Sequence, residues 1–353
     1  MNPLYISQKL YEHYEHVEEV KHYYGLLAIY ALLLTAEEKQ DPVLLEKCKT
    51  VLSRFPDRIE HPTYNFPSYR IGGIPKAYAL MKGHMPEAED QVRQYAEEMM
   101  TAARDRSGIM SYPYAPEREM IWIDVAMAVT PYLLFAGLAL GEERLIDEAA
   151  NQSFLMYEEF LDPENGLLHQ SKNFAGPGKY SQDHWGRGNG WGFLPLAELV
   201  QHLPQHSRHR PKAEKYFRDL AAALLPHQSE RGLWRQEIPF EYSYEETSGT
   251  GLFLYGIGVG MRCGLLDRDI YSPAFRKGIE GLNQISINVD FSTERSCPGC
   301  LCPGEGDEKG TVKSYVTLML PHRDEHHSFA PLMFAMVEAY RNGLYDLPRK
   351  SEA

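Results

Sequence analysis

A repeated pairing of helical segments is the feature of this sequence that most constrains its fold. At a spacing of roughly 50 to 60 residues, an apolar segment rich in small residues is followed by a more charged, amphipathic segment. The apolar segments begin at Tyr23, Ile74, Val125, Trp191, Gly251 and Phe329. The amphipathic segments begin at Pro42, Glu87, Arg144, Lys212 and Pro273, and residues 7–21 supply a sixth.

Helices that are apolar on every face must be buried on every face, which places the six apolar segments inside and their amphipathic partners outside. We therefore predict an all-α fold, an (α/α)6 barrel or six-hairpin toroid, built as a single domain from residues 1–353. An open helical solenoid would use the same helix pairs and stays an alternative. A closed ring is favoured because aromatic-rich loops precede the apolar segments and would share one rim. Strand signals are scarce, although the segments from Leu233 and Val312 could form short hairpins.

Charge and motif content exclude several classes of function. The formal net charge is −13 and no basic run occurs, which argues against nucleic acid or an anionic membrane surface as a partner.

The N-terminus shows no signal peptide, and no apolar stretch is long enough to span a bilayer. Five cysteines, an odd number, fit a reducing compartment, so we expect a cytoplasmic protein. No convincing nucleotide-binding glycine motif is present, and we expect no organic cofactor.

Residues 183–193, DHWGRGNGWGF, form the segment that most resembles a binding site. Its glycines allow the backbone to approach a ligand, and Trp185 and Trp191 offer flat apolar faces. Arg187 offers a planar fork of donors that suits a carboxylate. The segment therefore predicts a site for an acidic sugar. A tight turn with two tryptophans in the core is the structural alternative.

Asp124 is the candidate acid. It lies between Ile123 and Val125 at the start of a strongly apolar helix, where burial would raise its pKa and keep it protonated. A helix N-cap is the alternative role, because aspartate favours that position.

The segment ETSGTG, residues 246–251, precedes another apolar helix. Its hydroxyl residues, Thr247, Ser248 and Thr250, could bind substrate or cap that helix, and capping is the stronger interpretation. Glu245 and Glu246 are spare carboxylates that could replace Asp124 as the acid.

The WID sequence that ends at Asp124, the GRGNGW segment and ETSGTG together resemble the unsaturated uronyl hydrolases, glycoside hydrolase families 88 and 105. The resemblance covers about residues 25–340 and is nearest to the unsaturated rhamnogalacturonyl hydrolases. It implies an (α/α)6 barrel that removes the non-reducing 4,5-unsaturated uronic acid from oligosaccharides left by polysaccharide lyases, rhamnogalacturonan-type first. The implied mechanism uses one protonated carboxyl group, which delivers a proton to C4 of the vinyl ether. Water then adds at C5 and the hemiketal collapses.

The resemblance also implies roles for individual residues. Asp124 is the implied catalytic acid, and Arg187 is the implied partner of the uronate carboxylate. The other residues that we expect to bind substrate, by their matching positions or their places in these segments, are Trp122, His169, His184, Trp185 and Trp191.

One position departs from the family pattern. The family carries a second active-site aspartate at the start of its second inner helix, whereas the segment SYRIGGIPKAYAL, residues 68–80, has none and carries Arg70 instead. Arg70 is predicted to bind substrate as a second cation, facing a sulfate or another carboxylate on the adjoining sugar.

A cysteine-rich loop contains Cys297, Cys300 and Cys302, and it is followed by His322, His326 and His327. The spacing could suit zinc, but it lacks an evident second pair of ligands, and a plain cysteine-bearing loop is favoured, so no metal is assigned to the site. Two other functions remain open: an (α/α)6 sugar 2-epimerase-like isomerase and a non-catalytic carbohydrate-binding toroid. The isomerase would need paired histidines as acid and base.

Overall fold

Apolar helices form the inner ring of the barrel. The computed structural model describes residues 1–56, 70 and 72–348. Its inner helices are α2 (Tyr23–Lys39), α5 (Gly73–Met81), α7 (Asp124–Leu140), α9 (Gly186–His202), α11 (Thr247–Arg262) and α14 (Phe329–Arg341). Each contains one of the predicted apolar segments, and every residue of α7 from Val125 to Gly137 is buried.

Amphipathic helices surround this ring. They are α1 (Pro3–Val17), α3 (Pro42–Leu52), α6 (Glu89–Met100), α8 (Glu143–Phe160), α10 (Arg210–Leu224) and α12 (Arg268–Gly281). Each turns an apolar stripe toward the inner ring and a charged face toward solvent, as the 3.6-residue period requires. In α10, for example, Ala213, Phe217, Leu220 and Leu224 are buried, one turn apart.

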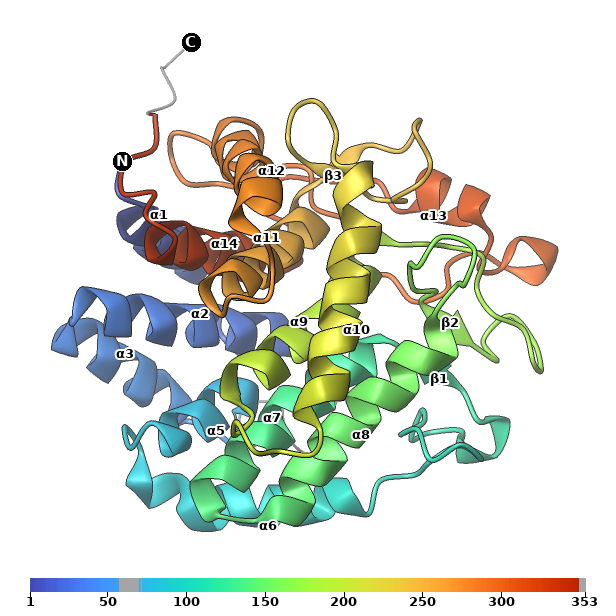
Figure 1. Ribbon diagram of the computed structural model, residues 1–353, viewed down its shortest axis with the longest axis horizontal. Helices are drawn as coiled ribbons and strands as arrows, with labels where there is room; N and C mark the ends of the chain where they lie inside the picture. Colours follow the sequence, from blue (N-terminus) through green and yellow to red (C-terminus); the bar gives the residue numbers. More distant parts are fainter. Residues whose placement is uncertain (57–69, 71, 349–353) are drawn as a thin grey trace.

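The ring closes on itself. Each inner helix packs against the next one in the chain, and α14, the last, packs against α2, the first. Helix α1 covers this junction by contacting both, and Figure 1 shows blue α1 beside red α14. The predicted all-α toroid is therefore confirmed over the described residues, and the open solenoid is excluded.

Short strand pairs tie together the loops at one end of the barrel. Strand β1 (Ile121–Trp122) pairs antiparallel with β2 (Ser171–Lys172), and β3 (Trp234–Arg235) pairs antiparallel with β4 (Glu245–Glu246). The expected hairpin from Leu233 thus exists in a shortened form. In Figure 1, β1, β2 and α13 (Val312–Leu318) lie together, on the side of the view away from α3.

The predicted hairpin at Val312 is wrong, because this segment is helix α13. Its start is set by Thr311, whose side chain accepts a hydrogen bond from the Ser314 amide. Local capping chemistry therefore prevails over the β-branched residues of the segment.

Several helices, among them α12 and α9, begin earlier than the sequence suggests. Helix α12 begins at Arg268, because Asp267 caps it by accepting from the Asp269 amide, and Pro273 lies inside the helix. Helix α9 begins at Gly186, so the glycine-rich segment is helical rather than a turn. Close packing accounts for those glycines: a Cβ added at Gly190 would lie 2.5 Å from the Leu252 side chain.

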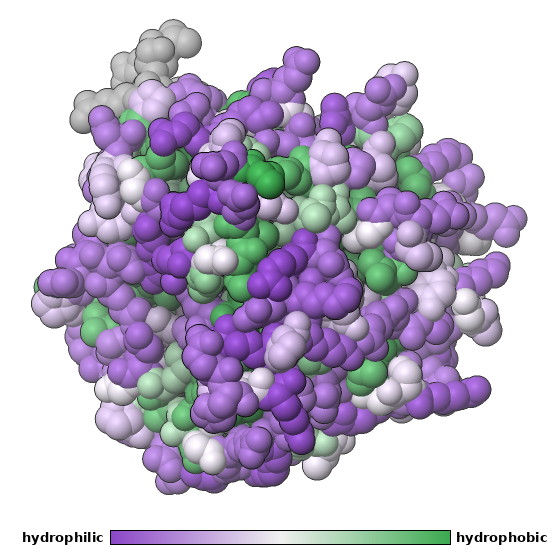
Figure 2. Space-filling view, viewed as in Figure 1, coloured by the Kyte–Doolittle hydropathy of each residue, from purple (hydrophilic) through white to green (hydrophobic). Residues whose placement is uncertain are grey.

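The surface over α8 and α10 is mainly polar, with small scattered apolar areas (Figure 2). No helix in the described part of the chain is both long enough and apolar enough to cross a membrane.

Candidate active site

A cavity of about 210 Å³ lies where several inner helices begin, an end of the barrel that we call the N-terminal rim. First-turn residues of α2, α7 and α9 contribute to it, together with the cysteine-rich loop and one residue of the segment before α14. The lining residues are His22, Tyr23, Tyr24, Asp124, Trp185, Arg187, Gly299, Cys300 and His327. The fold therefore brings the predicted acid, the predicted arginine and one predicted tryptophan to one cavity.

Asp124 has the environment of a protonated acid. It is the first residue of α7, whose N-cap is Ile123, so the capping alternative does not apply. Its Oδ2 atom is buried and has no hydrogen-bond partner among the described residues. Burial is the main cause that raises the pKa of Asp124 to about 7; the Arg187 guanidinium opposes this shift, and Asp183 contributes to it. The carboxyl group therefore keeps its proton to a much higher pH than an exposed aspartate.

Arg187 is almost fully buried and is held from several sides. Its Nη1 donates to Ser248 Oγ at 3.0 Å and to the Cys297 carbonyl, and its Nη2 donates to the Pro298 carbonyl at 2.6 Å. The guanidinium also lies 4.6 Å from the Trp185 ring centre. Its Nε is buried and has no hydrogen-bond partner among the described residues, so the guanidinium keeps an unused donor.

Glu246 holds the loop that carries the carbonyl partners of Arg187. Its carboxylate accepts from the amides of Ser248 (2.8 Å), Gly249 (2.6 Å) and Cys297 (2.9 Å). It therefore caps α11 and anchors the cysteine-rich loop at once. This structural use argues against Glu246 as a replacement acid.

A chain of hydrogen bonds that the sequence did not reveal lies on another side of the cavity. The Tyr23 hydroxyl contacts His327 Nε2 at 2.5 Å, and His327 Nδ1 contacts Glu325 Oε1 at 2.7 Å. Although burial works against it, the His327 ring lowers the pKa of Glu325 to about 2, so this carboxyl group is ionised. The run HYYG at residues 22–25, just before an apolar segment, is the signal that could have pointed to Tyr23.

Several predicted binding residues do not line this cavity. Trp191 is buried within α9, and Trp122 is buried beside Tyr112. Arg70 forms an ion pair with Glu98, and it lies 5.1 Å from the Tyr95 ring centre. Part of the segment around Arg70, residues 68, 69 and 71, lies outside the described residues. Contact of these three side chains with substrate stays a prediction.

His169 and His184 form a second cluster with Asp162. The two imidazole rings are 4.9 Å apart, and His184 Nε2 lies 2.9 Å from Asp162 Oδ2. Neither histidine lines the Asp124 cavity. Their predicted contact with the sugar therefore also stays a prediction.

The cysteine-rich loop does not form the zinc site considered above. Among the described residues, the side chains whose ligand atoms gather closely enough for a metal include no cysteine. The nearby histidines are engaged elsewhere: His322 with the Arg323 carbonyl, His326 with Glu18, and His327 with Glu325. Gly299 and Cys300 instead form part of the cavity wall.

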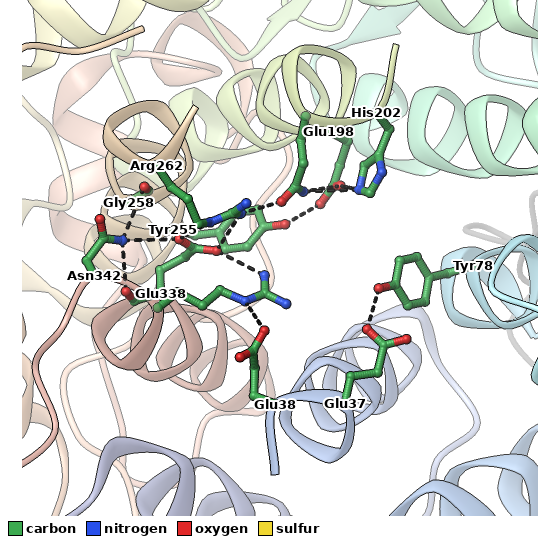
Figure 3. Close-up of polar contacts among 12 residues, drawn as sticks. Glu37, Glu38, Tyr78, Glu198, His202, Tyr255, Gly258, Arg262, Glu338 and Asn342 are labelled. Carbon is green, nitrogen blue, oxygen red and sulfur yellow. Dashed lines mark hydrogen bonds and ion pairs between the residues drawn. The ribbon is translucent and has the colours of Figure 1, made fainter. Parts of the chain in front are cut away.

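A larger cavity, of about 1140 Å³, opens at the opposite end of the barrel, the C-terminal rim. Figure 3 shows a network of polar contacts at this rim: Arg262, which lines the cavity, donates to buried Glu338, and buried Tyr255 donates to buried Glu198. These charges already neutralise one another. They therefore leave fewer unpaired polar groups for a ligand than the Asp124 cavity does. Size alone does not identify the active site here.

Comparison with known proteins agrees with this assignment of the fold. The family model described as Glycosyl Hydrolase Family 88 matches residues 5–342. The chain belongs to this family. An unsaturated 3S-rhamnoglycuronyl hydrolase of Formosa agariphila is 31% identical over 171 residues, which is 46% of this chain and 45% of the relative. An unsaturated rhamnogalacturonyl hydrolase of Bacillus subtilis is 25% identical over 52% of this chain and 56% of the relative.

These alignments of the Family 88 chain thus span about half the length of the curated relatives. Its fold extends further: a glycoside hydrolase of family 105 from C. acetobutylicum superposes with a TM-score of 0.79 at 19% identity. That superposition covers 95% of this chain and 99% of the other.

Proposed function

We propose that this Family 88 protein is a glycoside hydrolase that removes a 4,5-unsaturated uronic acid from the non-reducing end of lyase-generated oligosaccharides. The whole chain, residues 1–353, would act as one catalytic barrel. The observation that carries the proposal is the buried, unpartnered carboxyl oxygen of Asp124 in the same cavity as Arg187. Relatives named for unsaturated rhamnoglycuronyl and rhamnogalacturonyl substrates support rhamnose as the adjoining sugar.

The chemistry follows from the state of Asp124. Its protonated carboxyl group transfers a proton to C4 of the vinyl ether, and positive charge develops at C5. Water adds at C5 and gives its proton to the newly formed Asp124 carboxylate. The resulting hemiketal opens, releases the remaining oligosaccharide, and leaves the acid protonated for the next cycle. One carboxyl group is enough, unlike the two that ordinary glycoside hydrolysis requires.

Arg187 and Trp185 would hold the uronate. The unused Nε donor of the guanidinium suits a carboxylate in a charge-assisted hydrogen bond, and the indole beside it offers an apolar face. Because the carbonyls of Cys297 and Pro298 already fix the guanidinium, little side-chain entropy would be lost on binding.

The test is loss of the ultraviolet absorbance of the conjugated uronate, measured with oligosaccharides that lyases release from pectin, glycosaminoglycan and ulvan. Wild type should consume at least one of them. Asp124→Asn should be slower by roughly 100- to 10,000-fold, the usual contribution of a general acid.

Glu246→Gln is not a suitable control, because Glu246 holds the cavity loop. Asp219→Asn, which removes a surface ion pair with Lys215 on α10, serves instead and should keep wild-type turnover. No loss of absorbance with any substrate would contradict the proposal. Sugar isomerisation without such loss would point to the isomerase, and binding without turnover would point to the carbohydrate-binding toroid.

We also propose a cytoplasmic location and a small anionic oligosaccharide as the partner, not nucleic acid or a membrane. The free thiols of all five cysteines support a reducing compartment. Fractionation of the native host cells would test the location.

A further inference from the structure

Three side chains of types that can bind metal ions, from separate segments, meet beside the N-terminus of α9. Asp162 follows the end of α8, His169 lies in the turn before β2, and His184 lies two residues before α9. One ligand atom of each lies within 4.8 Å of the other two. Two imidazoles and one carboxylate are the donor types of open zinc sites, in which a fourth position is left to water.

Hydrogen bonds to the ring atoms orient both histidines. His169 Nδ1 lies 3.0 Å from the Asp183 carbonyl, which can only accept, so Nδ1 carries the proton and Nε2 keeps its lone pair. His184 Nδ1 faces the buried carboxyl group of Glu237 at 3.9 Å, while its Nε2 faces Asp162. Metal-binding histidines commonly have such a partner on one ring nitrogen, which leaves the other nitrogen for the metal.

The distances leave room for an ion after a small movement. His184 Nε2 and Asp162 Oδ2 are 2.9 Å apart, and two ligands of a tetrahedral zinc ion are separated by about 3.3 Å. Asn165 Nδ2 lies 3.0 Å from Asp162 Oδ2 and 3.1 Å from His184 Nε2, so this amide would have to turn away from the histidine to admit the ion. The charged partner that the structure gives Asp162 is His184, so no lysine or arginine among the described residues would have to be displaced.

We propose that Asp162, His169 and His184 bind one divalent transition metal ion of the zinc class. The ion would join the end of α8 to the segment that leads into α9. Because His169 is bonded to the peptide of Asp183, and the Asp183 carboxylate accepts from the Trp185 amide, the ion would also fix the backbone that positions Trp185 and Arg187. This role goes beyond the proposed hydrolysis, in which no step uses a metal.

Metal content tests the site independently of activity. The full chain, stripped with a chelator, would be incubated with zinc chloride, desalted and analysed for zinc. Wild type should retain about one zinc ion per chain, the content of a single three-ligand site. Asp162→Asn, which preserves side-chain shape, and His169→Ala should each lower the zinc affinity by at least tenfold.

The matched control is Asp147→Asn, because Asp147 pairs with His209 at 2.7 Å but belongs to no three-ligand group among the described residues. It should retain zinc like wild type. Zinc should also raise the Tm of wild type and of Asp147→Asn but not of Asp162→Asn, and magnesium should raise none of them, since it prefers oxygen ligands.

Retention of no zinc by wild type would overturn the proposal. Equal retention by wild type and Asp162→Asn would overturn it as well, because the ion would then be bound elsewhere. Melting of the stripped variants shows whether each is folded, and His169→Ala supplies a second reading if Asp162→Asn is not.

Discussion

The pKa of Asp124 predicts how activity depends on pH. The protonated form is the active one and its pKa is about 7, so kcat/KM should fall about tenfold per pH unit above that value. Arg187 lowers the pKa of Asp124, so Arg187→Gln should move this alkaline limb to higher pH while raising KM. Initial rates across a pH series measure both effects. An alkaline limb that stays in place in Arg187→Gln would contradict the coupling.

Single residues of the site were predictable where each stands in a short, unusual segment of the sequence. Asp124, Trp185 and Arg187 do so, and the structure places them around one cavity. Tyr23 and Glu325 could not be found in this way, because Tyr23 and His327 are 304 positions apart and meet only after the ring closes. His169 and His184 were recognised as polar residues of the site region, but their pairing with Asp162 required coordinates.

The Asp124 carboxyl group should also affect stability. Asp124 has a pKa of about 7 when folded and near 3.8 when unfolded, so between these values the folded state binds more protons. The free energy of unfolding of wild type should therefore decrease as pH rises through this window. Asp124→Asn lacks this term, so its stability relative to wild type should be greater at pH 8 than at pH 4, as judged by urea unfolding. An equal difference at both pH values would contradict the burial of Asp124.

At the scale of helices, the apolar and amphipathic segments were predicted well because each long segment repeats its pattern over several turns. The starts of helices were predicted less well. Glycines in the first turns of α9 and α11 disfavour helix by intrinsic propensity, yet the two helices approach so closely there that only glycine fits. A Cβ at Gly249 would lie 2.7 Å from the Gly186 carbonyl carbon. Packing of this kind leaves no local signal of a boundary.

Caps at the site and at the surface should differ in their contribution to stability. Glu246 is buried and accepts from the amides of Ser248, Gly249 and Cys297, whereas exposed Asp267 accepts from the Asp269 amide at the start of α12. Glu246→Ala should lower the free energy of unfolding by at least 2 kcal/mol, because buried donors lose their acceptor. Asp267→Ala should cost about 1 kcal/mol. Chemical denaturation of both variants compares them, and equal losses would contradict a buried role for Glu246.

At the scale of the whole molecule, the number of helix pairs was enough to predict the toroid, since six pairs of this kind close a ring. The sequence did not reveal the network of buried charges at the C-terminal rim of the barrel. Glu338 is fully buried at the C-terminal rim, where it accepts from Arg262 and Arg341 at 3.0 Å each (Figure 3). Isolated glutamates and arginines in helical segments look like ordinary surface charges, so this network had no signature.

The network should stabilise the barrel without taking part in catalysis. Glu338→Ala leaves two arginines without their buried partner and should cost roughly 3–5 kcal/mol. Glu214→Ala, which removes a carboxylate from the surface pairs with Arg210 and Arg218, should cost at most about 1 kcal/mol. Well below its Tm, Glu338→Ala should keep the wild-type KM, because the Asp124 cavity is at the opposite rim. A large rise in KM would show that the two rims are coupled.

Because several inner helices begin around one cavity, their peptide dipoles also converge there. Each helix N-terminus carries about half a positive charge, which falls off within the first turn. The protein as a whole carries a net charge of −13, so it repels an anionic sugar at a distance. Inside the cavity, the positive ends of the helices attract the same sugar. Salt at about 0.1 M screens the exposed charges over about 10 Å but leaves the enclosed field of the helix ends largely intact. Moderate ionic strength should therefore favour, rather than hinder, the capture of an anion by this acidic barrel.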